Sequence, residues 1–463
     1  MQMGKRLTAM AVAIIASLIA YQPLFAAKSG KCGDNLNWAI DESGNLTITG
    51  SGDMWGYDVN GPWGSSVKSI SMSNGVTGIG ARAFAGCNNL TSVTISKSVK
   101  TIGFFAFRSC TALTDVTIGN SVTSIGSGSF ENCNALKRLE IGGSVESIEA
   151  RAFNGCKALM SIRIPNSVKS IGASAFYGCS DATDLTIGRS VKTIGNRAFC
   201  GCATLTSVTI PSSVEAIEEY AFWGCRALAN LTIPNSVTTL ASSAFGLTNL
   251  TDLRIDMTTI GSQFSRSNTL KRITIGNSVK EIGQTAFLYC NALTDVVIPN
   301  SVKSIGASAF RGCKALTDLT IGNSVETIGF QAFIECGNLK SIASLAPVPP
   351  TCDRNVFDSP TYQKCVLRVP RQSMELYKKT SPWSYFFSTV ENDGVETVAN
   401  DSVCVNVADG IIVVDGVKDD AEMEVYDVSG TAIYRGRVKA VAVPTAGVYI
   451  VRVVGTAEKV LVR

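Results

Sequence analysis

The chain of 463 residues contains no histidine, and this absence excludes several kinds of active site. Ser-His-Asp triads, Cys-His pairs and histidine-ligated metal centres all require an imidazole. The sequence also lacks a Cys-x-x-Cys pair and a glycine-rich phosphate-binding motif placed after a strand, which are common signs of a zinc or nucleotide site. We therefore expect a protein that is not an enzyme and that holds no cofactor and no metal.

The sequence also lacks a large excess of charge of either sign and lacks long apolar runs. The chain has 41 Lys and Arg against 37 Asp and Glu, and a net charge of +4 gives no electrostatic reason to expect nucleic acid as a partner. After the first 20 residues, no stretch approaches the ~18 consecutive apolar residues of a transmembrane helix. We expect no transmembrane span.

The N-terminus has the composition of a secretory leader. Lys5-Arg6 precedes an apolar run from Leu7 to about Ala20, and small residues follow at Ala26-Ala27. A basic start, a short apolar centre and small residues at the end are typical of a signal peptide. Residues 1–27 are therefore predicted to direct export, and we expect the mature chain to be extracellular or on the outer-membrane surface.

The rest of the sequence is dominated by one repeated unit, L-x-x-V-x-I-[PG]-x-S-V-x-x-I-G-x-x-A-F-x-x-C. Its phenylalanine recurs every 23 residues, with one interval of 19, at Phe84, Phe107, Phe130, Phe153, Phe176, Phe199, Phe222, Phe245, Phe264, Phe287, Phe310 and Phe333. A fixed period in the twenties with many apolar positions predicts a β-rich solenoid of leucine-rich-repeat type, here of about 13 coils from Ile70 to Ile342. At the short interval we expect a local kink or change of curvature and no domain break.

Each repeat is predicted to form a strand, a second short extended piece and a turn. In Val93-Thr94-Ile95 the apolar-polar-apolar alternation has the period of a half-buried strand. Residues 98–103 are expected to form the second extended piece. Ala106, Phe107 and Cys110 follow at a spacing that suits one turn pointing inward. Stacking such coils buries continuous ladders of Val, Ile, Leu and Phe.

Fifteen cysteines stand out in a chain predicted to be exported. Ten of them share one repeat position: Cys87, Cys110, Cys133, Cys156, Cys179, Cys202, Cys225, Cys290, Cys313 and Cys336. Buried free thiols would act there as small hydrophobes. Disulfides between neighbouring coils are the alternative, because stacked Cα atoms would lie within the permitted range of about 4.4–6.8 Å. Cys352 and Cys365 lie outside this row and are the better disulfide candidates.

The repeats occupy residues 67–344, and the segments on either side of them are predicted to cap the solenoid. Residues 28–66 contain two alternating strands joined as a hairpin, with Trp38, Trp55 and Trp63 covering the first coil. In residues 345–392 a proline-rich run should end the ladder, because consecutive prolines cannot continue it.

A short helix is expected there at Gln372 to Lys379, followed by an aromatic lid for the last coil: Trp383, Tyr385, Phe386 and Phe387. Residues 393–403 read as a linker. Residues 404–463 are rich in alternating valines separated by Gly-containing turns, which predicts a small C-terminal β-sandwich.

The repeat core S-V-x-x-I-G-x-x-A-F-x-x-C closely resembles that of BspA-like leucine-rich-repeat proteins on the surfaces of Bacteroidetes and other microbes. Cys32 to Met54 is similar to the element that often precedes such repeats, and Pro349 to Trp383 to their usual C-terminal cap. The tail, with Val425-Tyr-Asp-Val-Ser-Gly and Gly447-Val-Tyr-Ile-Val-Arg-Val, resembles the type A C-terminal sorting domain of the type IX secretion system. These resemblances imply adhesion to host matrix proteins or to other bacteria, and export by secretion machinery that recognises 404–463.

The outward positions of the first strand form the candidate binding face. Threonine predominates there, and charged residues interrupt it in one region. Because a uniform face cannot fix the register of a partner, this region is the predicted recognition patch. The candidate ligand-binding residues are Arg138, Glu140, Arg163, Asp115, Thr117 and Thr186. The alternative is a solvated sheet whose threonines reflect β-propensity alone.

Three functions are compatible with these patterns. The first is a binding protein that adheres to a protein ligand, either host extracellular matrix or another bacterial surface. The second is a self-assembling structural surface protein. The third is a secreted glycan hydrolase, because Asp295 and Asp318 share one outward position on adjacent coils, at about the 5 Å spacing of a retaining glycosidase pair. No pocket is evident around that pair.

Overall fold

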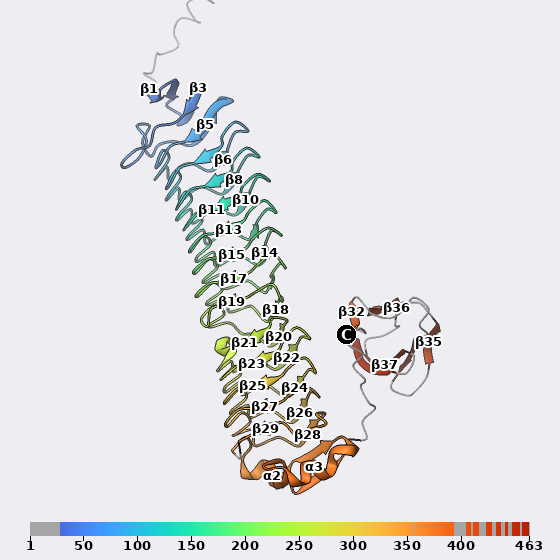
Figure 1. Cartoon of the computed structure of the whole chain (residues 1–463). Coiled ribbons are helices and arrows are strands. Elements are labelled where there is room, and N and C mark those ends of the chain that lie inside the picture. The colour runs from blue at the N-terminus through green and yellow to red at the C-terminus, as the bar shows by residue number, and fades with distance from the viewer. Residues whose placement is uncertain are drawn as a thin grey trace, which may run out of the picture.

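The computed structural model describes residues 28–353 and 355–392, together with seven strands of the C-terminal region. The predicted leader, 1–27, and the predicted linker, 393–403, lie outside the described residues. Between residues 28 and 392 the chain winds into a β-solenoid that is capped at both ends (Figure 1). The predicted fold class is confirmed.

One side of the solenoid carries the first strand of every coil, and these strands run parallel to one another. They are β4 (Ser69–Met72), β6 (Ser92–Thr94), β8 (Asp115–Thr117), β10 (Arg138–Glu140), β12 (Ser161–Arg163), β14 (Asp184–Thr186), β16 (Ser207–Thr209), β18 (Asn230–Ile233), β20 (Asp252–Ile255), β22 (Arg272–Ile275), β24 (Asp295–Ile298), β26 (Asp318–Ile321), β28 (Ser341–Ser344), β30 (Val366–Val369) and β31 (Ser388–Glu391). The described chain therefore has 15 turns, two more than expected.

The second strands of the coils form another parallel row. They are β5 (Gly75–Ile79), β7 (Thr101–Ile102), β9 (Ser124–Ile125), β11 (Ser147–Ile148), β13 (Ser170–Ile171), β15 (Thr193–Ile194), β17 (Ala216–Ile217), β19 (Thr239–Leu240), β21 (Thr259–Ile260), β23 (Glu281–Ile282), β25 (Ser304–Ile305), β27 (Thr327–Ile328) and β29 (Thr351–Cys352). In most of them an isoleucine points into the core, as the repeat pattern predicted.

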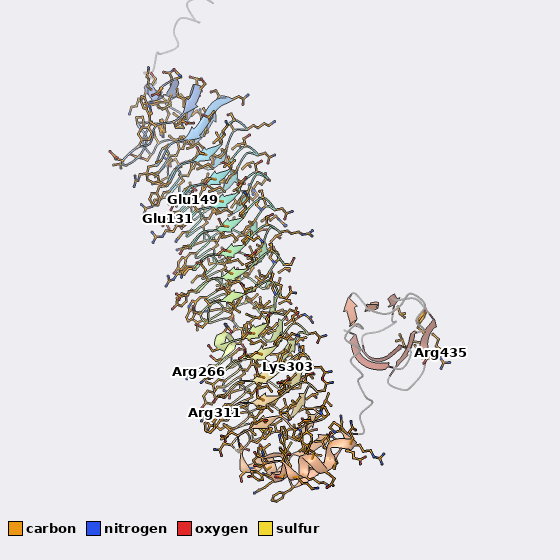
Figure 2. The ribbon with its side chains drawn as sticks, in the orientation of Figure 1. Glu131, Glu149, Arg266, Lys303, Arg311 and Arg435 are labelled. Carbon is orange, nitrogen blue, oxygen red and sulfur yellow. The ribbon has the colours of Figure 1, made fainter. Side chains whose placement is uncertain are left out.

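The third side, called here the turn row, contains the repeating phenylalanine of each coil, as in residues 103–110. The rings stack face to face along the solenoid axis, with neighbouring centroids 4.9 to 5.5 Å apart in the regular coils. This spacing is close to the ~4.8 Å that separates paired strands, so the backbone ladders set the stacking distance. Glu131, Arg266 and Arg311 belong to this row and lie along one edge of the molecule (Figure 2).

The ten repeat cysteines are free and buried. Nine of them donate the thiol hydrogen to the carbonyl oxygen of the phenylalanine 26 residues earlier, at 3.1 to 3.5 Å. Burial raises the pKa of Cys156, Cys225 and Cys290 to about 12. The interpretation as buried thiols is confirmed, and no disulfide joins neighbouring coils among the described cysteines.

The N-terminal cap is an antiparallel sheet of β1 (Lys28–Gly33), β2 (Leu36–Ile40) and β3 (Asn45–Asp53), and β3 continues in parallel into β4 and β5. Trp63 closes the ring stack by packing on Phe84 at 5.2 Å, and Trp38 meets Trp63 edge to face. Trp55 does not join this cluster as expected. Trp55 is 43% exposed, and its Nε1 donates to Asp34 Oδ1 at the surface.

The C-terminal cap consists of α2 (Ser359–Lys364), η2 (Arg371–Ser373), α3 (Met374–Lys379) and η3 (Trp383–Tyr385). The prediction that the prolines end the ladder is wrong, because the chain returns to the first-strand row beyond them: β30 pairs with β28, and β31 with β30. Phe357 closes the ring stack on Phe333 at 5.5 Å.

The aromatic lid is smaller than expected. Trp383 and Phe386 are buried, whereas Tyr385 and Phe387 are exposed. Trp383 is held by a hydrogen bond from its Nε1 to the Pro350 carbonyl oxygen at 2.9 Å, so the proline segment anchors the lid.

The solenoid is irregular at the short repeat interval, as expected, but the change affects only part of each coil. The first-strand row continues without a break through β16, β18, β20 and β22, whereas the second-strand sheet ends at β19 and a new sheet begins at β21. Directly after β21 the chain forms η1 (Ser262–Phe264). The ring of Phe264 is 6.4 Å from both neighbouring rings. The coils are therefore joined on one side and separated on the other.

The C-terminal region contains β32 (Cys404–Ala408), β33 (Ile411–Asp415), β34 (Met423–Asp427), β35 (Ala432–Gly436), β36 (Ala440–Ala442), β37 (Gly447–Val453) and β38 (Thr456–Val462). They form two antiparallel sheets, one of three strands and one of four. None of the helices in the described part of the chain has the length and apolar character needed to cross a membrane.

Candidate binding face

The predicted recognition patch lies on the outward side of four consecutive first strands. Strand pairing places Asp115 beside Arg138 and Thr117 beside Glu140 on β8 and β10. It places Arg163 beside Thr186 on β12 and β14. The strand residues between these positions point inward, so the predicted side chains share one outward face. The structure therefore brings the six predicted residues together in three neighbouring pairs.

Two of the charged residues already neutralise each other. Arg138 Nη2 forms an ion pair with Asp115 Oδ1 across the boundary between two coils. Asp115 also accepts a hydrogen bond of 2.6 Å from Thr114 Oγ1. The arginine side chain is 74% exposed, so the pair is solvated and contributes little to stability. Its effect is to fix where the guanidinium lies.

Glu140 and Arg163 differ from that pair. Both are exposed, and neither forms an ion pair with any residue that the structure describes. They stand where the sheet pairing is interrupted, because β10 ends one group of paired strands and β12 begins the next. An acid and a base without partners on a flat polar face are available to a charged partner.

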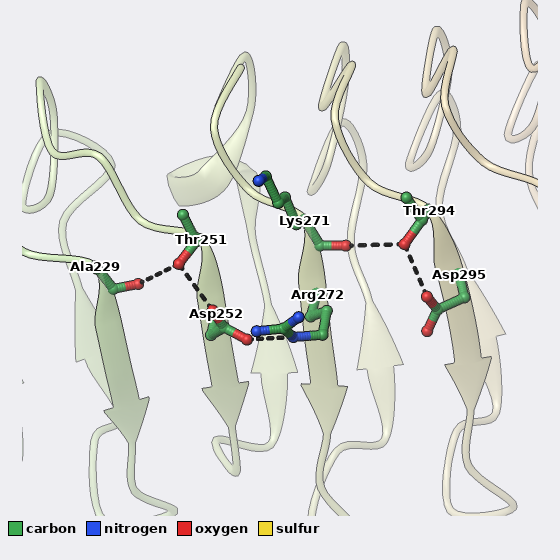
Figure 3. A network of polar contacts seen from close by, with 7 residues as sticks. All are labelled: Ala229, Thr251, Asp252, Lys271, Arg272, Thr294 and Asp295. Atoms are coloured by element: carbon green, nitrogen blue, oxygen red, sulfur yellow. Dashed lines mark hydrogen bonds and ion pairs between the residues drawn. The ribbon is translucent and has the colours of Figure 1, made fainter. Parts of the chain in front are cut away.

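A second arrangement on this face was not found from the sequence. Thr251 Oγ1 lies 3.3 Å from the Ala229 carbonyl oxygen and 2.7 Å from the carboxylate of Asp252. Asp252 in turn pairs with Arg272, and Figure 3 shows these contacts. Thr294 makes the same two contacts with Lys271 and Asp295. The dipeptides that show this threonine-to-aspartate bond are Thr114-Asp115, Thr183-Asp184, Thr251-Asp252, Thr294-Asp295 and Thr317-Asp318.

The repeated Thr-Asp dipeptide is visible in the sequence and could have predicted this arrangement. The threonine orients the carboxylate at the start of the strand, so an arginine on the next coil can pair with it, as Arg138 and Arg272 do. Asp295 and Asp318 are two more members of the series and are direct neighbours in the ladder. Both are exposed on the flat sheet, and each accepts from its own threonine. The arrangement explains them as structural carboxylates.

The remaining predicted site, a disulfide between Cys352 and Cys365, is not formed. Both thiols are free, and they belong to different rows of strands. Cys352 ends β29 in the second-strand row, whereas Cys365 precedes β30 in the first-strand row. Burial raises the pKa of each to about 12, so both thiols are protonated at neutral pH. Among the described residues, no group of three or more His, Cys, Asp or Glu side chains is placed to hold a metal.

The family model described as "BspA type Leucine rich repeat region" matches residues 63–183, 169–294 and 256–361, which together span more than half of the chain. No curated protein sequence matches the chain.

Several solved structures are similar. A leucine-rich repeat protein from Bacteroides ovatus is 25% identical, covering 71% of this chain and 99% of its own, with a TM-score of 0.39. A leucine rich cell surface protein from Faecalibacterium prausnitzii is 27% identical, covering 69% and 95%, with a TM-score of 0.36. A leucine-rich repeat protein from Eubacterium ventriosum is 24% identical, covering 66% and 94%, with a TM-score of 0.39.

Proposed function

Because this chain belongs to the BspA-type leucine-rich-repeat family, we propose that it is a non-catalytic cell-surface protein that adheres to proteins of a host matrix or of another bacterial surface. The observation that carries the proposal is the pair Glu140 and Arg163, exposed and without ion pairs among the described residues, beside the fixed Arg138. A flat face with a non-repeating charge pattern can recognise one register of a protein partner. Repetition of the coils lets weak contacts add along an extended ligand.

The test is a binding screen of the full chain on immobilised extracellular-matrix proteins, followed by charge reversal of the patch. Arg138→Glu, Glu140→Arg and Arg163→Glu together should weaken binding at least tenfold without lowering the thermal midpoint, since exposed charges contribute little to folding. The matched control is three changes on regular coils of the same face: Thr209→Glu, Thr232→Arg and Thr274→Glu. If the threonine set abolishes binding and the patch set does not, the patch is on the wrong coils.

Export is part of the proposal. Residues 1–27 would direct the chain across the inner membrane, and 404–463 would serve as the sorting domain for the type IX machinery. A chain truncated before Asp401 should then fold and remain in the periplasm. Its display on the surface at normal levels would remove the sorting role from 404–463 and leave the binding role untouched.

Self-assembly into a structural surface layer is less compatible with the ends of the solenoid. An assembly through end coils needs an open ring stack, but Trp63 and Phe357 cover its two ends. Sedimentation of the purified chain at high concentration distinguishes the two functions, because a structural protein would associate without an added ligand.

A further inference from the structure

The turn row opens into a groove where the repeat is four residues short. The cavity has a volume of about 530 Å³, and its walls come from the coils of Phe222, Phe245 and Phe264. Arg226 and Arg266 line it, and none of the described residues lining it carries a carboxylate. Neither arginine forms an ion pair within the described chain. By contrast, Arg108 and Arg311, on regular coils of the same row, are neutralised by Glu131 and Glu335.

The same groove contains backbone N–H groups whose equivalents in regular coils donate to carbonyl oxygens of the next coil. In the coil of Phe153, the Phe153 N–H donates to Ala175 at 2.7 Å and the Gly155 N–H to Tyr177 at 2.8 Å. The equivalent N–H groups of Phe245 and Leu247 have no hydrogen-bond partner among the described residues.

The direction of the Phe245 and Leu247 N–H groups follows from the carbonyl groups that precede them in the chain. Ala244 and Gly246 accept from Phe222 and Gly224 on the previous coil. In a trans peptide the next N–H points the opposite way, so the Phe245 and Leu247 N–H groups point into the groove.

Two side chains on the walls also depart from the repeat. The Gln263 Nε2 donates to the Leu240 carbonyl oxygen at 3.0 Å, and its Oε1 is buried without a partner in the described chain. Leu247 is 58% exposed and has φ 54°, at a position where six other coils have glycine. Five other coils have a non-glycine residue with a similar φ at this position, Arg266 among them, so the conformation belongs to the repeat. What distinguishes Leu247 is the apolar surface that it exposes beside the two arginines.

We propose that this groove binds an extended acidic peptide segment of a partner protein. Arg226 and Arg266 neutralise its carboxylates, and Leu247 contacts an apolar side chain. The Phe245 and Leu247 N–H groups donate to alternate carbonyl oxygens of the peptide. In regular coils of this row, the next coil supplies these carbonyl oxygens. Backbone pairing of this kind favours a peptide over an acidic sugar, because a sugar has no regular row of amide carbonyls. The site is separate from the patch around Arg138 and does not depend on it.

The test measures fluorescence anisotropy of a labelled hexapeptide of alternating Glu and Leu with the full chain at low ionic strength. Arg226→Ala with Arg266→Ala should weaken binding at least tenfold. The matched control, Arg151→Ala with Lys157→Ala, removes two exposed cations from a regular coil of the same row and should change affinity less than twofold. Leu247→Gly should weaken this peptide several-fold and leave an alternating Glu-Gly peptide unchanged.

A peptide with Lys in place of Glu should not bind, and reversal of Arg138, Glu140 and Arg163 should not affect the Glu-Leu peptide. Absence of binding to the wild-type chain, or equal loss in the two double variants, would overturn the proposal. So would displacement of the peptide by hexagalacturonate at equal concentration, which would assign the groove to acidic sugars. Circular dichroism of each variant shows that it is folded.

Discussion

The Cys156 thiol donates its hydrogen to the carbonyl oxygen of Phe130 at 3.3 Å, from one coil to the one before it. The same contact recurs through the array and links the repeat cysteine of one coil to the repeat phenylalanine of the coil before it. The carbonyl lies beside the ring stack, away from water, so it needs a donor small enough to fit there. Cysteine supplies that donor, and burial keeps the thiol protonated by raising its pKa to about 12.

Protection from alkylation is the first prediction. Because the thiolate is the reactive form and the repeat thiols are buried, iodoacetamide at pH 8 should modify few cysteines of the native chain. After denaturation it should modify ten or more, counted by intact mass. Five or more disulfides in the purified protein would contradict the free ladder that the structure shows.

Alkaline pH should destabilise the solenoid through the same thiols. A folded-state pKa of about 12 for Cys156, against an ordinary value of 9.0, means that above pH 9 only the unfolded chain releases this proton. The stabilisation is therefore complete below pH 9 and is lost as the pH rises toward 12. Between pH 8 and pH 10, wild type should lose about 1.4 kcal/mol more than Cys156→Ala in urea denaturation. Equal losses would show that the thiol titrates alike in both states.

The ring stack should respond unevenly to truncation. Phe176 has neighbours at 5.1 and 5.5 Å, and Phe176→Ala should cost about 3–5 kcal/mol of unfolding free energy. Phe264, at 6.4 Å from both neighbours, is packed more loosely, and Phe264→Ala should cost at least about 1 kcal/mol less. Chemical denaturation of the two variants makes the comparison. A larger loss at Phe264 would mean that the irregular coil is held by its core after all.

The 23-residue repeat predicted the ladder of phenylalanines, the two rows of strands and the row of cysteines, because each depends only on which residues recur in every coil. It left open whether those cysteines are free or bridged, which the structure answers with free thiols. The Arg138–Asp115 pair could not be predicted in the same way, since it depends on how two long side chains meet across the ladder. The groove at Phe245 was also missed. The missing residues indicated an irregular coil, but not that the first-strand row would stay joined while the turn row lost its backbone hydrogen bonds.

The prediction that Trp55 helps to cover the first coil was wrong, because the sequence alone does not distinguish the environment of Trp55 from that of Trp63. Both follow the hairpin, and either could have covered the first coil. The structure places one at the surface and the other against Phe84.

That difference gives the last prediction. Trp63 is buried and forms the end of the ring stack, so Trp63→Ala should uncover Phe84 and cost about 3–5 kcal/mol. Trp55 is 43% exposed, and Trp55→Ala should cost less than about 1 kcal/mol. A solenoid whose end coil is open presents apolar side chains and unpaired edges to a second copy. Trp63→Ala should therefore form dimers or larger species in sedimentation velocity, while wild type and Trp55→Ala stay monomeric. If Trp63→Ala is folded and still monomeric, the tryptophan contributes packing only, and the hairpin β1 to β3 is sufficient to prevent association.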